Sequence, residues 1–328
     1  MGMVIDGSWV EDDSKYRNPT GGAFVRAESI WRSKITSDGS SGFKAEPGRY
    51  HLFLAPSCPW AHRTQIVRRL KGLEDVISAT LSDKPRVRSW AYTKGIDELQ
   101  PSENGILELH EVYIKADSNY SGRVTVPTLW DRHKKTIVNN ESSEIIRMLN
   151  TEFDEWATGE ISDLYPESHQ EEIDQLNDRI YETVNNGVYR CGFAKSQTAY
   201  EEYIHPMFDT FDFLEERLSQ NRYLVAEYPT EADWRLFVTL IRFDFVYFSH
   251  FKCNIRRIQD YPNLWNYTLD LYQTPGVSDI VDIEGIKKGY YGGQSQVNPT
   301  RIVPTGPFID LEAAHNRESL SSAAKLLG

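Results

Sequence analysis

The hydrophobic pattern of the chain first becomes regular near residue 50. Residues 50–54, Tyr-His-Leu-Phe-Leu, form a largely apolar run that is typical of a buried strand. Residues 64–70 then place Ile66, Val67 and Leu70 at the spacing of a helix face. The pattern therefore predicts a strand that turns directly into a helix.

Strand and helix signals continue to alternate along the next part of the chain. Residues 76–81 predict a second strand, residues 123–130 a turn that leads into a third, and residues 136–138 a short fourth. A helix is expected over the apolar positions of residues 145–149, and residues 82–122 are read as a long polar insert. The order strand, helix, strand, insert, strand, strand, helix predicts an α/β sandwich.

Helical spacing dominates the second half. Residues 171–180 have this spacing, and Thr230-Glu231-Ala232-Asp233 has the form of a capping box. Tyr261-Pro262 is expected to begin a later helix. An apolar stripe with a separation of three or four positions lies between them, at Phe208, Phe211, Leu214 and Leu218. This part of the chain is predicted to be an all-α domain.

These patterns divide the chain into four parts. A polar, Gly/Ser-rich extension over residues 1–45 precedes the α/β domain at residues 46–150, and the all-α domain follows at residues 151–290. Residues 291–328 contain several Gly and Pro residues and are interpreted as an extended C-terminal arm. Phe24 and Trp31 indicate that the N-terminal extension packs on another part of the protein.

Composition narrows the possible functions. A net charge of −12 and a pI near 5.2 argue against binding to nucleic acid or to an anionic membrane. Three cysteines are too few for a disulfide framework, no metal-ligand set is visible, and no apolar run reaches 18 residues. The start of the sequence lacks the features of a signal peptide, so a reducing cytoplasm is the expected location.

Cys58 is the strongest candidate for chemistry. It lies at the predicted strand-to-helix turn, and Pro59 suits the first position of the helix. The positive end of a helix stabilises a thiolate, which is the nucleophilic form of cysteine. Ala61 occupies the position at which a dithiol motif has its second cysteine, so Cys58 has no local resolving partner. The alternative is a buried, inert cysteine in a Pro-containing turn.

Two further features suit a peptide ligand. Pro127 interrupts a strand pattern and is expected at a strand start or after a cis bond, which leaves the Val126 backbone free to pair with an extended peptide. Glu141 and Ser142 stand at a predicted helix N-terminus, where free amides favour a carboxylate. A helix cap is the alternative role for Ser142. With Cys58, these features favour a short acidic peptide that carries a thiol.

The chain resembles the glutathionyl-hydroquinone reductases, the Xi class of glutathione transferases, from Trp31 to about Pro307. The motifs that carry the resemblance are Cys58-Pro59-Trp60-Ala61-His62-Arg63, Gly122-Arg123-Val124-Thr125-Val126-Pro127, Val138-Asn139-Asn140-Glu141-Ser142-Ser143-Glu144-Ile145, Asn185-Asn186-Gly187-Val188-Tyr189, Arg242-Phe243-Asp244 through Tyr247 to His250-Phe251-Lys252-Cys253-Asn254, and Tyr290-Tyr291. The resemblance implies a thioredoxin-like N-terminal domain, an all-α C-terminal domain and a homodimer.

The resemblance also implies roles for individual residues. Cys58 would be the nucleophile, Tyr189 would donate a proton to the leaving hydroquinone, and Tyr247 and Tyr290 would lie near the sulfur and stabilise its thiolate. Glutathione, as co-substrate with glutathionyl-hydroquinones and with no metal, would be bound by Trp90, Arg123, Val124, Thr125, Val126, Glu141 and Ser142.

Other interpretations remain open from the sequence. An omega-like thiol transferase or dehydroascorbate reductase would use the same Cys58 and the same glutathione site. A non-catalytic interaction module with the transferase fold would not need a cysteine at a helix start. On pattern alone, Tyr247 is typical of a core residue and Tyr189 of a loop aromatic.

Overall fold

The computed structural model describes residues 2–12, 22–86, 88–161 and 163–320. The chain separates into two compact units, one comprising Met1–Pro19 with Arg26–Ser162 and the other Thr20–Val25 with Asp163–Gly328. The boundaries of the four parts inferred from the sequence stay a prediction. Residues 13–21 of the expected extension and residues 321–328 of the expected arm lie outside the described residues.

A four-stranded sheet with the order β4-β3-β7-β8 forms the centre of the first unit. Its strands are β3 (Tyr50–Leu54), β4 (Ser78–Leu81), β7 (Thr128–Asp131) and β8 (Thr136–Asn139). Strand β3 is buried along its whole length, pairs in parallel with β4 and pairs antiparallel with β7. The apolar run that predicted a buried strand is therefore confirmed.

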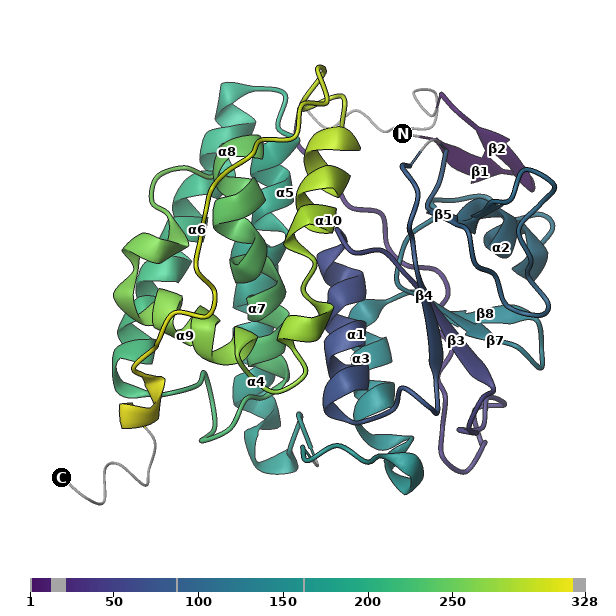
Figure 1. Cartoon of the computed structure of the whole chain (residues 1–328), viewed down its shortest axis with the longest axis horizontal. Helices are drawn as coiled ribbons and strands as arrows, with labels where there is room; N and C mark the ends of the chain where they lie inside the picture. The colour runs from purple at the N-terminus through teal and green to yellow at the C-terminus, as the bar shows by residue number, and fades with distance from the viewer. Residues whose placement is uncertain (1, 13–21, 87, 162, 321–328) are drawn as a thin grey trace. The chain divides into compact units, whose positions relative to one another are not determined.

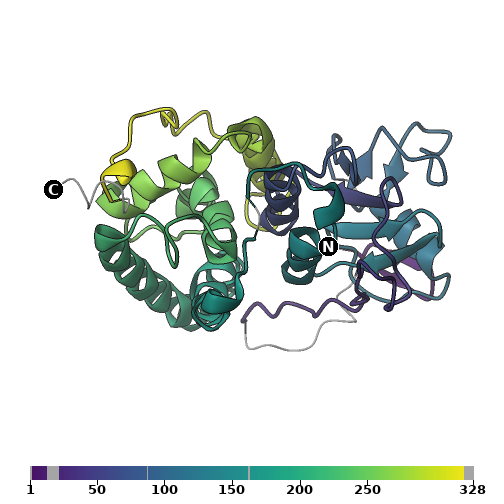
Figure 2. The same cartoon turned by 90° about the horizontal axis from the view of Figure 1, so that it is seen from below.

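Helices cover both faces of this sheet. Helix α1 (Pro59–Leu70) and helix α3 (Ser142–Thr151) lie side by side on one face, and α2 (Leu109–Ala116) lies on the other (Figure 1). Figure 2 shows the same pairing of α1 with α3 from below. The arrangement confirms the predicted order of strands and helices, and it is that of a thioredoxin-like domain.

The insert at residues 82–122 contains secondary structure that its polar composition did not predict. It contains α2 and the short strands β5 (Ala91–Tyr92) and β6 (Leu107–Glu108). Leu109, Val112 and Tyr113 give α2 a buried face, but the helix has only eight residues. So short an element adds too few apolar positions to stand out from its polar neighbours.

The second strand is shorter than the pattern predicted. It begins at Ser78, because the amides of Val76 and Ile77 both donate to Leu73 O in the turn that follows α1. Both side chains are buried, so they contribute to the core from a turn and not from the sheet. Burial in a turn and burial in a strand leave the same apolar signal in the sequence.

The N-terminal segments pack as their aromatic residues indicated. Strand β1 (Met3–Ile5) pairs with β2 (Ser8–Val10), and Val4 exchanges two backbone hydrogen bonds of 3.0 and 2.9 Å with Gly122. The ring of Trp31 lies 6.3 Å from that of Tyr120. In the second unit, the ring of Phe24 lies 5.2 Å from that of Phe193.

The second unit is helical, as predicted. Its α-helices are α4 (Gln170–Ile180), α5 (Gly187–Gly192), α6 (Gln197–Gln220), α7 (Glu231–Arg242), α8 (Phe248–His250), α9 (Pro262–Tyr272) and α10 (Ile283–Lys287). Among the described residues, π-helical turns directly follow α4, α7 and α10; they are η4 (Tyr181–Asn185), η5 (Phe243–Tyr247) and η8 (Lys288–Gly292).

Helix α7 is the core helix of this unit, and all 12 of its residues are buried. Its predicted capping box is present, with Thr230 as N-cap and Asp233 bonding back to the Thr230 amide. The apolar stripe on α6 is also buried, and the ring of Phe211 lies 5.2 Å from that of Phe243. Beyond η8 the chain is largely irregular and is held where Gln273 donates to Leu311 O at 2.9 Å.

A buried ion pair fixes one edge of the first unit. Arg49 donates to the Asp131 carboxylate over 2.6 to 3.2 Å, and the amides of His133 and Lys134 donate to the same carboxylate. We expect Asp131→Ala to lower the free energy of unfolding by about 3 kcal/mol, since Arg49 would remain largely buried with only the more exposed Glu46 as counter-ion. Urea unfolding followed by tryptophan fluorescence measures this loss.

A matched control is the exposed ion pair between Arg132 and Asp97, with an N–O distance of 2.9 Å. Asp97→Ala should leave the unfolding midpoint nearly unchanged, because exposed pairs are screened by solvent. An equal loss in both variants would contradict the importance given to the buried pair.

Candidate functional site

Cys58 lies at the junction of β3 and α1, as the sequence predicted. It is the N-cap residue of α1, with Pro59 at the first helical position. Its carbonyl accepts from the His62 amide at 3.0 Å, and its own amide donates to Ala55 O at 3.1 Å. The backbone therefore holds the side chain of Cys58 at the N-terminal end of the helix, where a thiolate is stabilised.

The segment before β7 faces this cysteine. The Val126–Pro127 bond is cis, and Pro127 immediately precedes β7. Pro127 therefore combines the two expected features, a cis bond and a position at a strand start. The Cys58 thiol donates to Val126 O over 3.3 Å. In the part of the chain that the structure describes, the Val126 amide has no hydrogen-bond partner. One backbone donor close to the thiol is thus available to a ligand.

The N-terminus of α3 is capped by Glu141 and not by Ser142. The Glu141 carboxylate accepts from the Ser143 amide at 3.2 Å and from the Ser143 hydroxyl at 2.9 Å. Ser142 is the first helical residue, is buried, and accepts from Arg63 Nη1 at 3.4 Å. The alternative role of Ser142 as a helix cap is therefore wrong, and its hydroxyl is oriented by a cation instead.

Trp90 and Arg123, two other predicted glutathione contacts, lie near an arginine that the sequence did not single out. The Arg86 guanidinium stacks over the Trp90 ring at 4.9 Å. Burial lowers the pKa of Arg86, the charge of Arg123 lowers it further, and negative charge on Cys58 opposes both effects. The structure thus brings the Arg86 guanidinium within electrostatic range of Cys58. Arg123 itself donates to Gly2 O at 3.3 Å.

In the second unit, the three predicted tyrosines form a hydroxyl cluster. Tyr290 Oη lies 2.6 Å from Tyr189 Oη and 2.8 Å from Tyr247 Oη. All three side chains are buried. Tyr291 is turned away from the cluster, because its hydroxyl bonds Ser249 and Phe245 O instead. The structure therefore assigns Tyr290 to the cluster.

Burial determines the charge of this cluster. It raises the pKa of Tyr247 and of Tyr290 well above the ordinary value, and the neighbouring Tyr189 raises both further. These hydroxyls consequently keep their protons at neutral pH and act as donors. Because Tyr290 Oη contacts both other hydroxyls, the three tyrosines form one hydrogen-bonded row along which a proton can move.

Each tyrosine of the cluster is associated with a π-helical turn. Tyr247 is the last residue of η5, and Tyr290 lies within η8. Tyr189 lies in α5, directly after η4, so its interpretation as a loop aromatic is wrong. Single π turns are rare in helices and occur often at functional sites.

The other two cysteines lie in a different environment from Cys58. Cys191 and Cys253 are both buried, and burial raises the pKa of Cys253, with a further increase from the adjacent Cys191. The Cys253 thiol therefore resists ionisation. Cys58 is therefore the cysteine in the described chain whose backbone position favours a thiolate.

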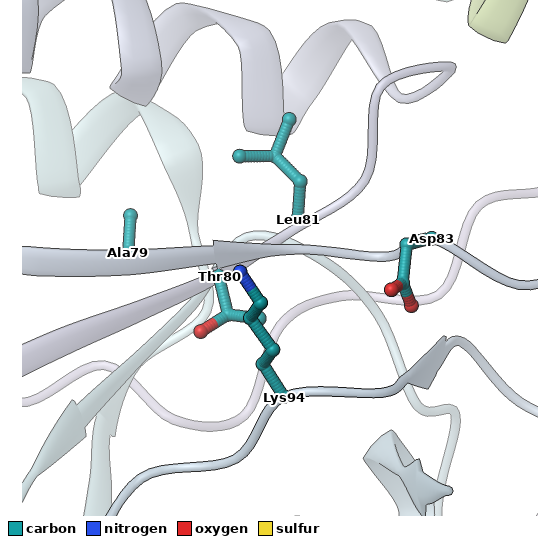
Figure 3. A pocket seen from close by; sticks show the side chains of 5 residues that line it. All are labelled: Ala79, Thr80, Leu81, Asp83 and Lys94. Carbon is teal, nitrogen blue, oxygen red and sulfur yellow. The ribbon is translucent and has the colours of Figure 1, made fainter.

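Neither of two cavities in the described part of the chain is lined by a predicted site residue. One of about 290 Å³ lies beside β4, but Ala79 and Leu81 point away from Thr80 and Lys94 (Figure 3). Alternate strand residues face opposite sides, so they do not converge on one ligand. A second cavity, of about 350 Å³, contains no predicted site residue.

Among the described residues, no group of three or more His, Cys, Asp or Glu side chains is arranged to hold a metal ion. None of the helices in the described ranges has the length and apolar character that crossing a bilayer requires.

Comparison with known proteins shows the family to which the chain belongs. The model of the glutathione S-transferase N-terminal domain matches residues 57–152, and that of the C-terminal domain matches residues 197–268. The chain is 49% identical over 310 residues to glutathionyl-hydroquinone reductase PcpF of Sphingobium chlorophenolicum, which covers 94% of this chain and 96% of that protein. It is 42% identical to glutathione S-transferase omega-like 2 of Schizosaccharomyces pombe, over 89% and 95% of the two chains.

Solved structures give the same assignment. The Xi-class transferase of Natrialba magadii superposes with a TM-score of 0.87 at 43% identity and covers 98% of both chains. Glutathione-bound YqjG of Escherichia coli K-12 superposes with a TM-score of 0.85 at 42% identity over 97% and 99% of the chains. The predicted thioredoxin-like and all-α architecture is confirmed. The chain belongs to the glutathione transferases, and within them to the Xi class of glutathionyl-hydroquinone reductases.

Proposed function

We propose that Cys58 carries out the reaction of this family in the present chain, the glutathione-dependent reduction of glutathionyl-hydroquinones to hydroquinones. The observation that carries the proposal is the position of Cys58, an N-cap thiol beside a cis-Pro segment with an available backbone amide. A thiolate is the nucleophile that thiol exchange requires. The chain is an enzyme by its family membership.

The first step breaks one bond and forms another. A glutathionyl-hydroquinone carries glutathione on an aromatic carbon through a thioether. The Cys58 thiolate attacks the glutathione sulfur, and a Cys58–glutathione disulfide forms. The electron pair of the broken carbon–sulfur bond remains with the ring carbon, which takes a proton and becomes free hydroquinone. The ring is reduced and the two sulfurs are oxidised.

The second step regenerates the enzyme. The thiolate of a second glutathione attacks the mixed disulfide, releases oxidised glutathione and restores the Cys58 thiolate. Ala61 favours this outcome, because no second cysteine lies at the fourth position of the motif to resolve the disulfide internally. One hydroquinone and one oxidised glutathione are formed per cycle.

The remaining expected residues have supporting roles in this scheme. Tyr189 supplies the proton to the ring carbon. Tyr247 and Tyr290 hold Tyr189 in a network of hydrogen-bonded hydroxyls, and they stabilise the Cys58 thiolate by donating hydrogen bonds to it. Glutathione is bound by Trp90, Arg123, Val124, Thr125, Val126, Glu141 and Ser142. The family resemblance also supports a homodimer, and the three free cysteines are compatible with the reducing cytoplasm expected from the sequence.

Product analysis with glutathionyl-menadiol or glutathionyl-chlorohydroquinone and excess glutathione tests the proposal. We expect free hydroquinone and oxidised glutathione in equal amounts, with little turnover of dehydroascorbate. The reverse preference would transfer the assignment to an omega-like thiol transferase. No reaction with either class of substrate would contradict both enzymatic interpretations.

A further inference from the structure

Two tyrosines of the first unit hold the segment that faces Cys58. Tyr120 Oη donates to Arg123 O at 2.6 Å, and Tyr113 Oη donates to Thr125 O at 3.0 Å. The Thr125 amide in turn lies 3.4 Å from Tyr113 Oη. The backbone carbonyl and amide of Thr125 are thus both directed to one side of the segment, towards Tyr113.

The residues between these anchors use the other side. Val126 O accepts from the Cys58 thiol. Within the described residues, the amides of Val124 and Val126 donate no hydrogen bond. Both valines are nevertheless largely buried, at 7% and 4% exposure. Buried amides in proteins are almost always paired, so this edge is ready to receive an extended peptide.

Tyr113 also connects this segment to the start of α3. Its hydroxyl accepts from Asn140 Nδ2 at 3.0 Å, and the same amide nitrogen lies 3.3 Å from Thr125 Oγ1. Asn140 directly precedes Glu141 and Ser142 in the chain. One hydroxyl on α2 therefore ties together the two places at which the first unit is expected to contact glutathione.

We propose that Tyr113 and Tyr120 are positioning residues for glutathione, an inference that rests on the proposed use of the Val124–Val126 edge and the α3 N-terminus as its site. Neither tyrosine needs to touch the ligand. Tyr113 is fully buried, and its aromatic ring packs 5.1 Å from that of Tyr120. The two rings form a rigid support, and their hydroxyls fix which backbone groups the segment presents to Cys58.

Removing the Tyr113 hydroxyl would remove hydrogen bonds that hold the segment, while the aromatic ring would still fill its place in the core. Thr125 O would keep one donor, the Thr128 hydroxyl at 2.7 Å. Asn140 would lose its closest acceptor and keep only the longer, 3.3 Å contact with Thr125 Oγ1, so the link between the segment and α3 would be weakened. The hydrogen bonds lost by the Asn140 side chain and by the Thr125 amide are expected to weaken an interaction that depends on this segment by about tenfold.

The test compares Tyr113→Phe with Tyr50→Phe. Tyr50 is equally buried, and its hydroxyl donates to Lys44 O at 2.6 Å, at the start of β3 and away from the Cys58 turn. Binding of S-methylglutathione, a glutathione analogue that cannot form a disulfide, is measured by calorimetry for the full chain. We expect Tyr113→Phe to weaken binding about tenfold, and Tyr50→Phe to change it less than twofold.

Steady-state kinetics provides a second readout. Tyr113→Phe should raise the KM for glutathione while kcat at saturating glutathione stays within about threefold, because the hydroxyl positions the ligand and does not react. Tyr120→Phe should shift KM in the same direction and serves as the second variant if Tyr113→Phe folds poorly. Thermal unfolding shows whether the three proteins are equally folded.

The outcomes separate this inference from the proposed function. Equal binding by Tyr113→Phe and Tyr50→Phe, or a fall in kcat with KM unchanged, would overturn the positioning role. A wild-type chain that binds S-methylglutathione but does not reduce glutathionyl-hydroquinones would overturn the proposed reaction and leave the positioning role to be decided by the binding data. A wild-type chain that does not bind the analogue would overturn both.

Discussion

Replacement of Cys58 by alanine is expected to reduce turnover of glutathionyl-hydroquinones by at least about a thousandfold. Both steps of the proposed cycle pass through the Cys58 sulfur, so nothing in the scheme replaces it, and removal of a nucleophile costs an enzyme several orders of magnitude. Cys58→Ser is expected to be almost as inactive, because a serine hydroxyl does not ionise near neutral pH and does not form a disulfide. Release of hydroquinone measures the effect.

The chain provides its own control for the reactivity of this cysteine. Iodoacetamide at neutral pH should label Cys58 first, as mapped by mass spectrometry, because Cys58 stands at a helix N-terminus, whereas Cys191 and Cys253 are buried more deeply and should react slowly. Substrate without added glutathione should leave glutathione attached to Cys58 in the wild type and to no residue of Cys58→Ala. Undiminished turnover in Cys58→Ala would mean that the cysteine is structural and that the proposed mechanism is wrong.

The second large effect is expected at the tyrosine cluster. Tyr189→Phe should slow hydroquinone release by about a hundredfold or more, the range that is typical of losing a positioned proton donor. The ring remains and keeps its packing, so the variant isolates the hydroxyl that lies 2.6 Å from Tyr290 Oη. Tyr291→Phe is the matched control, because the Tyr291 hydroxyl bonds Ser249 and Phe245 O outside the cluster.

The two half-reactions distinguish a proton donor from a structural residue. Only the first step delivers a proton to carbon, so reduction of a small mixed disulfide, which uses sulfur exchange alone, should be unaffected in Tyr189→Phe. A parallel loss in both assays would show that the substitution damages the fold or the Cys58 site, and the role as proton donor would then be rejected.

The raised pKa values of Tyr247 and Tyr290 also predict the pH dependence. A tyrosine with a raised pKa keeps its proton to higher pH than a free tyrosine, so Tyr247 and Tyr290 remain hydrogen-bond donors as pH rises from 7 to 10. Activity on glutathionyl-hydroquinones should therefore not fall over this range through loss of the donor. A rate that declines with an apparent pKa near 8 would show that the cluster ionises and would contradict its assignment.

The sequence was informative where a local rule determines structure. Pro59 and the apolar run before it placed Cys58 at a helix start, and the Thr230 capping box placed the start of α7, because strand and cap signals depend on neighbouring residues. The family motifs then identified the tyrosines, which no spacing rule would have connected. Tyr189 and Tyr290 are 101 positions apart, and only the folded chain shows that their hydroxyls meet.

The same limit explains what the sequence missed. Tyr113 lies in an eight-residue helix within a polar stretch, and its bonds reach Thr125 and Asn140, 12 and 27 positions away. Arg86 likewise gains significance only from its place over Trp90. Short buried elements and side chains that act at a distance have no local signature, so the geometry had to supply them.

The π turns at η4, η5 and η8 have a consequence for how this family can change over time. A π turn holds one residue more than the α-helix that would replace it, so deleting a single codon there would restore the α-helical path. Every residue beyond the deletion would then rotate about 100° around the helix axis. The tyrosine hydroxyls could thus be separated, or brought together again, by insertions and deletions of one codon, without replacing any of the tyrosines themselves.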